Sequence, residues 1–384
     1  MMKRVPLDKY CEKKIETLQK NYIGLIDYID ISAVDNEEKR IISYQTIDSK
    51  DAPSRAKQLI KKNDILVSTV RPNLNAVAVI ENETDNLMVA STGYCVLRCK
   101  DDADVRYMFN FCQSPYFIDD MTTQATGASY PAVSASIVKS SLIPCYSIGE
   151  QHEIANKIDT VSNLIALRKQ QLSKLDELVK SRFIEMFGDT ELNPYSWEKS
   201  TLGTICDVRD GTHDSPQYYE TGYPLVTSKN VTGGKIDMTD CSLICEADFQ
   251  KINERSKVDI GDIIMPMIGT VGKPVIVDIE PRFAIKNVAL IKFKIDTSVL
   301  NTYIQALLQS DYFDKAIISK VRGGTQKFIS LGDIRKLEIL VPPIEIQEQF
   351  AVFVEQIDKS KLAIQKSLEK FEILKKALMQ RYFG

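Results

Sequence analysis

Polar and basic side chains gather in glycine-punctuated loops in both halves of the chain. Arginine and lysine can donate to the edge of guanine, and asparagine and glutamine can pair with adenine, so this mixture suits hydrogen bonding to DNA bases. Gly323-Gly324 would let a phosphate approach the backbone, although an ordinary turn has the same sequence. The pattern does not separate residues that read bases from residues that hold phosphates. The candidates are Arg71, Thr92, Thr126, Tyr130, His213, Lys229, Asn230, Lys286, Asn287, Arg322, Thr325, Gln326 and Lys327.

The two histidines give little support to an enzyme mechanism. Neither His152 nor His213 has an obvious nucleophile beside it in the sequence, so Ser-His and Cys-His catalysis are disfavoured. His152 falls in the first turn of a predicted helix, where a surface position is the default. His213 lies among small and polar loop residues that could approach a DNA groove, and it stays in the candidate set. We expect no catalytic residues in the chain.

One short motif is similar to the signature with which adenine methyltransferases hold a flipped base. Asn193-Pro194-Tyr195 lacks one proline of that signature and precedes Trp197-Glu198 at the start of a new segment. No glycine-rich strand-to-helix turn for S-adenosylmethionine accompanies it. A linker is the better interpretation of these residues.

A phosphate-binding loop is also missing from the sequence. Gly269-Thr270-Val271-Gly272-Lys273 comes nearest, but Pro274 follows where such a loop needs Ser or Thr. A predicted strand comes next instead of a helix, so we expect a turn between strands. Neither a nucleotide nor another cofactor is expected.

Composition sets further limits. The net charge of −3 means that binding to phosphates would need local clusters of cations, and lysines and arginines do cluster in both halves. The alternative is that these charges only solvate the surface.

Eight cysteines occur without a CxxC pair, which predicts reduced and mostly buried thiols and no metal site. No apolar run approaches the roughly 20 residues of a membrane span, so we expect a soluble, cytoplasmic protein.

The elements that position these residues occur twice along the chain. Ile143-Pro144 leads into Gly149-Glu150-Gln151 and a long heptad-like segment that closes on Phe187-Gly188. About 196 residues later the same order returns and closes on Phe383-Gly384. An internal repeat of this length decides the architecture before any local motif does. The expected parts are globular residues 1–145, helical residues 146–190, globular residues 191–342 and helical residues 343–384.

Each globular part has an α+β pattern, with strands first and a helix after them. In the first part, strands are predicted at Asp64–Val70 and Ala76–Ile80, and a helix at Tyr107–Ile118. In the second part, the corresponding predictions are strands at Asp262–Met265, Pro274–Val277 and Val288–Phe293, and a helix at Tyr303–Ile318.

Each helical part carries apolar residues at alternating steps of three and four, which is the spacing of a coiled-coil seam. Two lone helices of this kind would leave their seams exposed, so we expect them to pair, antiparallel, with one globular domain at each end. The seam positions are Ile154, Ile158, Val161, Ile165, Leu172, Leu175, Val179 and Met186, then Phe350, Val354, Ile357, Ile364, Leu368, Phe371, Leu374 and Leu378.

Taken in order, these residues resemble the specificity (S) subunits of type I restriction-modification systems, over essentially the whole chain. Each matching piece is weak alone, and their order, recurring in both halves, is specific. The pieces are Ala52-Pro53-Ser54-Arg55-Ala56, Asp64 to Val70 with Arg71-Pro72, Ala90-Ser91-Thr92-Gly93-Tyr94, Gly127 with Tyr130 to Ser134, Asp210-Gly211-Thr212-His213, Gly261 to Ile264 with Ile268 to Gly272, and Gly323 to Ser330.

The resemblance implies a non-catalytic subunit with two target recognition domains, each binding one half of a split double-stranded DNA sequence. The paired helices would fix the gap between the halves and dock two methyltransferase subunits. Whether a restriction subunit that hydrolyses ATP also joins is left open. Because the two halves differ outside the matched pieces, the target should be asymmetric.

Two other functions remain to be weighed at this point. A self-sufficient adenine methyltransferase would transfer a methyl group from S-adenosylmethionine to DNA without a partner. A coiled-coil scaffold would bind proteins through its globular ends, and reversing the charge of Arg322 and Lys327 would not change its retention on DNA.

Overall fold

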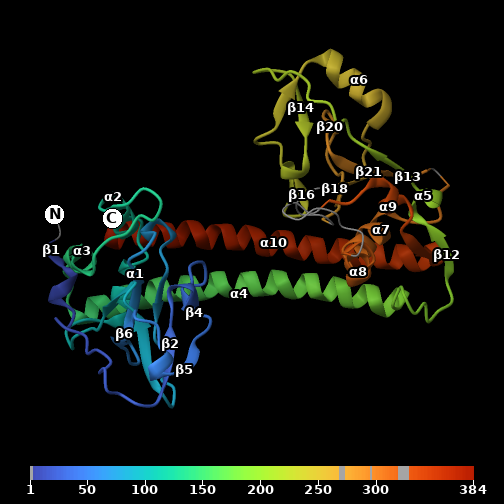
Figure 1. Ribbon diagram of the computed structural model, residues 1–384. Helices are drawn as coiled ribbons and strands as arrows, with labels where there is room; N and C mark the ends of the chain where they lie inside the picture. The colour runs from blue at the N-terminus through green and yellow to red at the C-terminus, as the bar shows by residue number, and fades with distance from the viewer. Residues whose placement is uncertain (1–2, 268–272, 295, 319–327) are drawn as a thin grey trace. The chain divides into compact units, whose positions relative to one another are not determined.

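The computed structural model describes residues 3–267, 273–294, 296–318 and 328–384, and the chain divides into two compact units (Figure 1). Unit 1 comprises residues 1–169 and 366–384, and unit 2 comprises residues 170–365. Each unit contains one set of strands and short helices together with a stretch of both long helices, α4 (Ile148–Phe187) and α10 (Ile344–Phe383).

The strands of unit 1 form two small sheets and two strand pairs. One sheet has the order β5-β2-β9-β6, in which β2 and β9 are parallel, and the other has the antiparallel order β10-β7-β8. β1 pairs with β11, and β3 pairs with β4. The elements are β1 (Arg4–Pro6), β2 (Leu25–Ile29), β3 (Val34–Asp35), β4 (Arg40–Ile41), β5 (Gln45–Asp48), β6 (Ala56–Leu59), β7 (Ile65–Ser68), β8 (Val77–Val79), β9 (Leu87–Ser91), β10 (Tyr94–Leu97), α1 (Val105–Phe111), α2 (Pro115–Thr123), α3 (Ala135–Ser140) and β11 (Leu142–Pro144).

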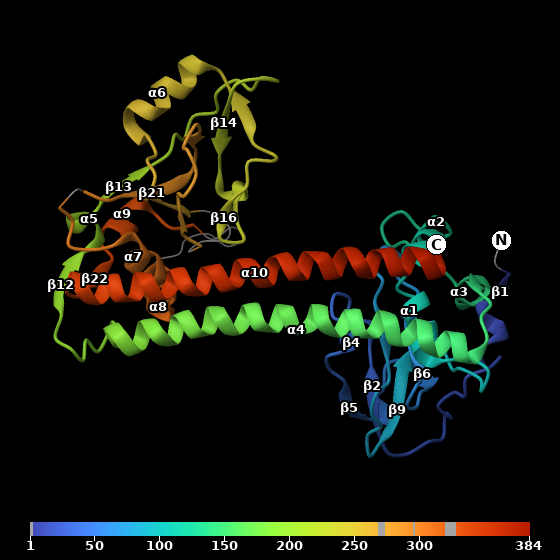
Figure 2. The ribbon, with the colours of Figure 1, turned by 180° about the vertical axis from the view of Figure 1, so that it is seen from behind.

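Unit 2 has the same plan, seen from behind in Figure 2. One sheet has the order β17-β14-β20 with β14 and β20 parallel, the other has the order β13-β21-β18-β19, and β12-β22 and β15-β16 are pairs. The elements are β12 (Glu198–Thr201), α5 (Leu202–Ile205), β13 (Asp207–Asp210), β14 (Tyr223–Val226), β15 (Val231–Thr232), β16 (Lys235–Ile236), β17 (Ser242–Ile244), α6 (Glu246–Ser256), β18 (Ile263–Pro266), β19 (Val275–Ile276), β20 (Ala284–Ile285), β21 (Val288–Lys292), α7 (Asn301–Leu308), α8 (Asp311–Ile318), α9 (Leu331–Arg335) and β22 (Glu338–Val341).

The predicted internal repeat is confirmed for most of the elements. The parallel pair β2–β9 returns as β14–β20, the sheet β10-β7-β8 returns within β13-β21-β18-β19, and the pair β1–β11 returns as β12–β22. Helices α1, α2 and α3 return as α7, α8 and α9. α6 has no helical counterpart in the described residues of unit 1. A short 3-10 turn at Ser49–Asp51 follows β5 there, where α6 follows β17 in unit 2. The α+β class is therefore correct for both units.

A buried glutamine attaches the first turn of each long helix to the globular part before it. Gln151 accepts a hydrogen bond from the Asp104 backbone N–H at 2.9 Å and donates to the carbonyls of Asp102 and Tyr146 at 3.3 and 3.1 Å. Both its amide atoms are thus satisfied in a fully buried position. One amide meets one donor and two acceptors, which an apolar side chain could not do.

Gln347 makes the same three bonds in unit 2. Its side chain accepts from the Leu300 N–H at 2.8 Å and donates to the carbonyls of Ser298 and Pro342 at 2.9 and 2.8 Å, and it is also fully buried. The repeat therefore extends from the order of the elements to individual hydrogen bonds.

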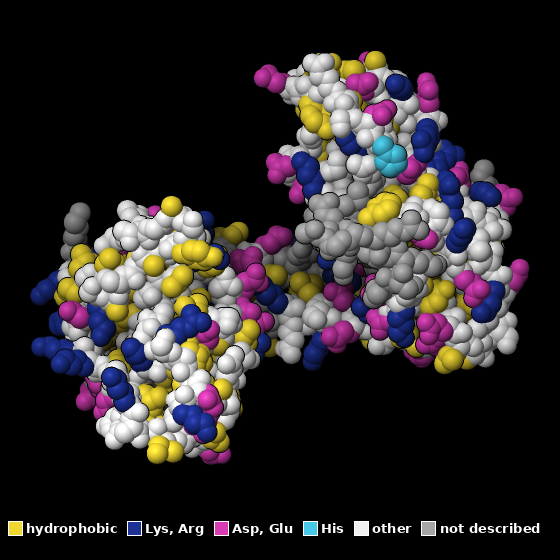
Figure 3. Space-filling view, viewed as in Figure 1, with side chains coloured by type: hydrophobic (Ala, Val, Ile, Leu, Met, Phe, Trp, Pro, Cys, Tyr) yellow, Lys and Arg dark blue, Asp and Glu magenta, His cyan; other side chains and the backbone are white. Residues whose placement is uncertain are grey.

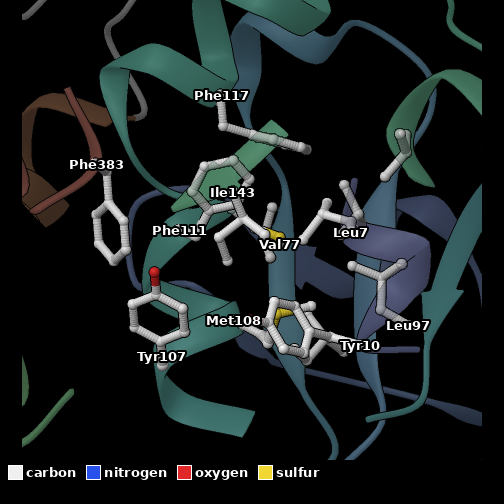
Figure 4. Close-up of a cluster of buried hydrophobic side chains, with 14 of the residues drawn as sticks. Leu7, Tyr10, Val77, Leu97, Tyr107, Met108, Phe111, Phe117, Ile143 and Phe383 are labelled. Atoms are coloured by element: carbon white, nitrogen blue, oxygen red, sulfur yellow. The ribbon is translucent and has the colours of Figure 1, made fainter. Parts of the chain in front are cut away.

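The far end of each long helix is held by a phenylalanine. Figure 4 shows Phe383 of α10 beside Tyr107 and Phe111 of α1, with ring centroids 5.3 and 5.7 Å apart. In unit 2, Phe187 of α4 contacts Tyr303 of α7 at 4.8 Å. Each long helix thus begins in one unit and ends in the core of the other.

Within unit 1 the two chain ends are joined by Arg4. Its guanidinium donates to the carbonyls of Phe383 and Gly384 at 2.9 and 2.7 Å, while β1 pairs with β11 just before α4. The first strand and the last helical turn are therefore parts of one folded unit.

The helix pairing is antiparallel, as predicted. In unit 1 the start of α4 and the end of α10 share one core, and in unit 2 the end of α4 and the start of α10 share another, with Phe183 and Phe350 5.7 Å apart. The predicted seam positions are buried or half-buried, with one exception. Leu374 is 44% exposed, and its neighbour Lys375 is half-buried beside Asp159 instead.

Two single helices predicted from sequence are each broken in two. Tyr107–Ile118 divides into α1 and α2, because Ser114 caps the second helix through the Phe117 N–H and Pro115 occupies its first position. Tyr303–Ile318 divides into α7 and α8 at Gln309 and Ser310. In the described parts of the chain, no helix combines the length and apolar character needed to cross a membrane.

The glutamine bonds should carry measurable stability. Replacing Gln347 by Met keeps the length of the side chain but leaves buried groups without partners, each of which costs about 1–3 kcal/mol, so we expect unit 2 to lose about 2–4 kcal/mol of unfolding free energy. Trp197, the only tryptophan, lies in unit 2 and reports its unfolding in urea by fluorescence. Gln365→Met, at an exposed position of the same helix, should change it by less than about 0.5 kcal/mol. Equal losses in the two variants would contradict the assignment.

Candidate nucleic-acid interface

Three loops of unit 1 that carry candidate residues are tied together by backbone hydrogen bonds. The Thr69 N–H donates to the Gly93 carbonyl at 2.9 Å, and the Val133 N–H donates to the Thr69 carbonyl at 2.9 Å. The loop after β7, the β9–β10 turn and the loop before α3 therefore form one platform. They bring Arg71, Thr92, Thr126 and Tyr130 onto connected segments, all four exposed.

A closed loop presents Tyr130. Thr126 and Ala132 exchange backbone hydrogen bonds of 3.0 and 2.9 Å, so residues 126–132 are joined at their base. Gly127 has a φ of +104°, and a Cβ there would lie 2.8 Å from the Tyr130 carbonyl oxygen, so the loop requires glycine. Tyr130 remains 69% exposed at the end of this tight loop.

Arg71 stacks over the Tyr130 ring, with its guanidinium carbon 5.0 Å from the ring centroid. Its backbone has a left-handed φ of 48°, fixed because its N–H donates to the Pro131 carbonyl at 2.7 Å. Arg71 and Tyr130, predicted from separate sequence motifs, thus form one exposed pair.

A buried asparagine supports the Arg71 loop from below. Asn75 donates to the Cys112 carbonyl at 2.8 Å, and its own carbonyl and side-chain oxygen accept from Lys39 at 2.6 and 3.0 Å. Burial, with a smaller contribution from the positive charge of Lys375, lowers the pKa of Lys39 to about 8. Neither Lys39 nor Asn75 was predicted as a site residue, because no sequence signal joins β3–β4 to this loop.

In unit 2, His213 lies between two acceptors. Its Nδ1 is 2.8 Å from Asn287 Oδ1 and its Nε2 is 2.9 Å from Asp210 Oδ2. The protonated imidazolium can donate to Asn287 Oδ1 and Asp210 Oδ2 at the same time, so this arrangement favours the charged form of the ring. The hydrogen bonds to Asn287 and then to Asp210 raise the pKa of His213. The His213 side chain is 62% exposed, so the ring itself faces solvent.

Asp210 connects His213 to α6. This carboxylate is buried and also pairs with Arg255, near the end of α6, while Arg209 Nη1 donates to the Arg255 carbonyl at 2.9 Å. Asp210 begins the Asp210-Gly211-Thr212-His213 motif, but its residue type alone indicates no contact with His213. Arg255 carried no sequence signal, because α6 has no counterpart in the first half.

Lys286 and Asn287 form the turn beside His213. Asn287 has a left-handed φ of 54°, and Lys286 donates from Nζ to Ser215 Oγ at 2.7 Å. A Cβ at Gly211 would lie 2.3 Å from the Ile285 carbonyl oxygen, so only glycine allows the two segments to approach this closely. Lys286, Asn287 and His213 thus come together as one group.

The remaining candidates of unit 2 have different outcomes. Lys229 is exposed at the 3-10 turn Ser228–Asn230. Asn230, predicted as a DNA contact, is only 3% exposed, and its amide bonds to Thr227 and to the Asp237 carbonyl, so its side chain is used within the protein. Arg322, Thr325, Gln326 and Lys327 lie outside the described residues, as does the proposed turn at 269–272.

The motif that is similar to a methyltransferase signature forms a turn. Asn193 has a φ of 46°, its amide donates to the Trp197 carbonyl at 2.9 Å, and its side-chain oxygen accepts from the Trp197 N–H at 2.8 Å. The Asn193 side chain is therefore committed to the protein's own backbone rather than offered to a base.

Charge on the visible face is mixed. Figure 3 shows lysine and arginine side chains interspersed with aspartate and glutamate on both units. On this face, any binding to phosphates would therefore depend on particular side chains rather than on one broad basic surface.

Comparison with known proteins gives a consistent family assignment. The model of the type I restriction modification DNA specificity domain matches twice, at residues 8–177 and 194–373. The chain is 26% identical over 352 residues to the type I restriction enzyme MjaIX specificity subunit of Methanocaldococcus jannaschii, covering 84% of this chain and 77% of that protein.

Two solved structures share the fold. A chain described under "Structural basis underlying complex assembly and conformational transition of the type I R-M system" is 24% identical with a TM-score of 0.60, covering 99% of this chain and 97% of that one. The S subunit of a type I restriction-modification system from M. genitalium is 16% identical with a TM-score of 0.59, covering 100% of this chain and 96% of that one.

The environment of His213 predicts its titration. With a folded-state pKa above the ordinary 6.5, protonated His213 adds stability below about pH 6.5 that is lost as pH rises through the folded pKa. NMR titration of the two histidines, assigned with His213→Gln, should show this raised pKa. Asp210→Asn should lower it, whereas Asp214→Asn, an exposed neighbour without a bond to the ring, should leave it in place. A His213 pKa at or below 6.5 in the parent chain would refute the imidazolium assignment.

Proposed function

The chain belongs to the type I restriction modification DNA specificity family, and from that premise we propose that it is the sequence-recognition subunit of a type I restriction-modification complex. Each globular part would bind one half of a split, double-stranded DNA target. The observation that carries the proposal is the duplication of one scaffold, down to the bonds of Gln151 and Gln347, beneath loops that differ in residue type.

Unlike loops support an asymmetric target. The loops of unit 1 present Arg71 stacked on Tyr130. The loops of unit 2 present His213, bonded to a carboxylate and an amide, beside Lys286. Different donors and acceptors select different base edges, so the two half-sites should differ in sequence. The proposed DNA-contacting residues among the described ones are Arg71, Thr92, Thr126, Tyr130, His213, Lys229, Lys286 and Asn287.

The long helices would set the spacing of the half-sites. Each is 40 residues long, which at about 1.5 Å per residue is about 60 Å, longer than the roughly 34 Å of one turn of B-DNA. Paired helices of this length can therefore serve two DNA segments about a turn or more apart.

The subunit would not be catalytic by itself and would work in the cytoplasm with partners. Methyltransferase subunits, two by the internal repeat, would dock on its helices and carry out the reaction, with or without a restriction subunit. The description of one solved relative in terms of complex assembly supports an assembled system. The use of the Asn193 amide within its own turn also disfavours a self-sufficient methyltransferase.

Assembly should change DNA binding sharply. We expect the isolated chain to bind DNA weakly and to transfer no methyl group from labelled S-adenosylmethionine. Addition of the methyltransferase subunits should produce tight binding to one asymmetric bipartite site, measured by competition between genomic fragments. An assembled complex that binds random duplex equally well would refute sequence recognition, and methyl transfer by the chain alone would refute the non-catalytic role.

Lys286 should contribute a phosphate contact. Replacing it by Gln removes one cation, so the slope of log affinity against log salt concentration should fall by roughly one for the assembled complex. Lys315→Gln, at an exposed position of α8, serves as the matched control and should leave the slope unchanged. If the chain were a scaffold that binds only proteins, neither the parent nor either variant would show a salt-dependent affinity for DNA.

A further inference from the structure

Arg71 differs from the other arginines of the first globular part. Within the described residues of this part, Arg71 is the one arginine whose guanidinium donates to no protein oxygen. The others donate to carboxylates or carbonyls: Arg4 to Phe383 and Gly384, Arg40 to Glu38, Arg55 to Asp30, Arg98 to Asp64 and Arg106 to Asp159. All the donors of the Arg71 guanidinium are thus open to a ligand.

The orientation of this guanidinium is restricted on one side. The guanidinium carbon lies over the Tyr130 ring, 5.0 Å from its centroid, so the aromatic face covers one side of the guanidinium. The guanidinium fork can donate two parallel hydrogen bonds to a phosphate or to the O6 and N7 atoms of guanine. Of these two contacts, only the one to guanine would discriminate between bases.

The backbone that carries Arg71 is also fixed before any ligand binds. Its N–H is bonded to Pro131, its carbonyl accepts from the Leu74 N–H at 2.9 Å, and buried Asn75 holds the same turn to Cys112. Less conformational entropy is then lost when the contact forms, which favours affinity at a defined position.

The second half of the chain has no equivalent arginine. The correspondence of β7 with β18 places Arg71 opposite Gly269 in the sequence, a residue outside the described parts of the structure. A contact made by Arg71 would therefore be specific to the half-site bound by unit 1.

We propose that Arg71, supported on one side by the Tyr130 ring, reads one guanine in the major groove of the half-site bound by the first recognition domain. This inference rests on the proposed function and deepens it, because it assigns one base and one residue to one half-site. Tyr130 acts as a positioning residue, and its hydroxyl is not needed for the stacking.

The test uses the full chain assembled with its methyltransferase subunits and a duplex library in which each position of the target is varied singly. The parent complex should require guanine at one position of the first half-site. Arg71→Lys keeps the charge and loses the fork, so discrimination at that position should fall by at least about fivefold, since one bidentate contact is worth roughly 5- to 150-fold. Tyr130→Ala should weaken discrimination at the same position, and Tyr130→Phe, which keeps the ring, should preserve it.

Discrimination at the second half-site, measured in the same complexes, controls for folding and assembly and should not change. The proposal is overturned if Arg71→Lys keeps full discrimination, if Arg71→Lys weakens binding equally for all sequences, or if the first half-site contains no guanine. If the proposed function itself were wrong, the result would differ, because the parent complex would then show no preference for a bipartite site.

Discussion

Two buried glutamines fix the two long helices to the globular parts that precede them. Gln151 and Gln347 each connect the first turn of a 40-residue helix to the globular part before it, by one accepted and two donated hydrogen bonds. Because the amide is fully buried, each bond that it makes removes the penalty of an unsatisfied backbone group. The start of each long helix is therefore fixed to a strand-rich core, and Phe187 and Phe383 fix the opposite ends.

This scaffold separates what must stay constant from what can vary. Tyr107 and Tyr303 donate to equivalent carbonyls, those of Pro144 and Leu340, and equivalent buried carboxylates pair with Arg98 in one unit and Lys292 in the other. Loops above such a core carry few buried contacts, so their residues can change without loss of the fold. The same scaffold therefore carries Arg71, stacked on a tyrosine, in one unit and His213, bonded to an aspartate and an asparagine, in the other.

The candidate site was only partly accessible from residue types. Gly-punctuated loops predicted Arg71, Tyr130, His213 and Lys286 as candidates, because turns and small residues are typical of segments that reach the surface. Asn230 has the same kind of sequence context but is buried as the last residue of a 3-10 turn, where it forms a capping box with Thr227. Asp210 and Arg255 could not be joined from sequence, since the ion pair between them links a strand to a helix that only unit 2 possesses.

The sequence by itself determined the duplication, the α+β class of each unit and the two long helices, because hydrophobic periodicity and an internal repeat are local or periodic signals. It could not determine that Tyr107–Ile118 breaks at Ser114-Pro115, nor that Lys375 and not Leu374 turns inward on α10. Those outcomes depend on capping and on which neighbours surround a side chain. The tertiary structure alone decided which loop residues meet, as Arg71 meets Tyr130 and His213 meets Asn287, because hydrogen bonds between distant segments have no periodicity in the chain.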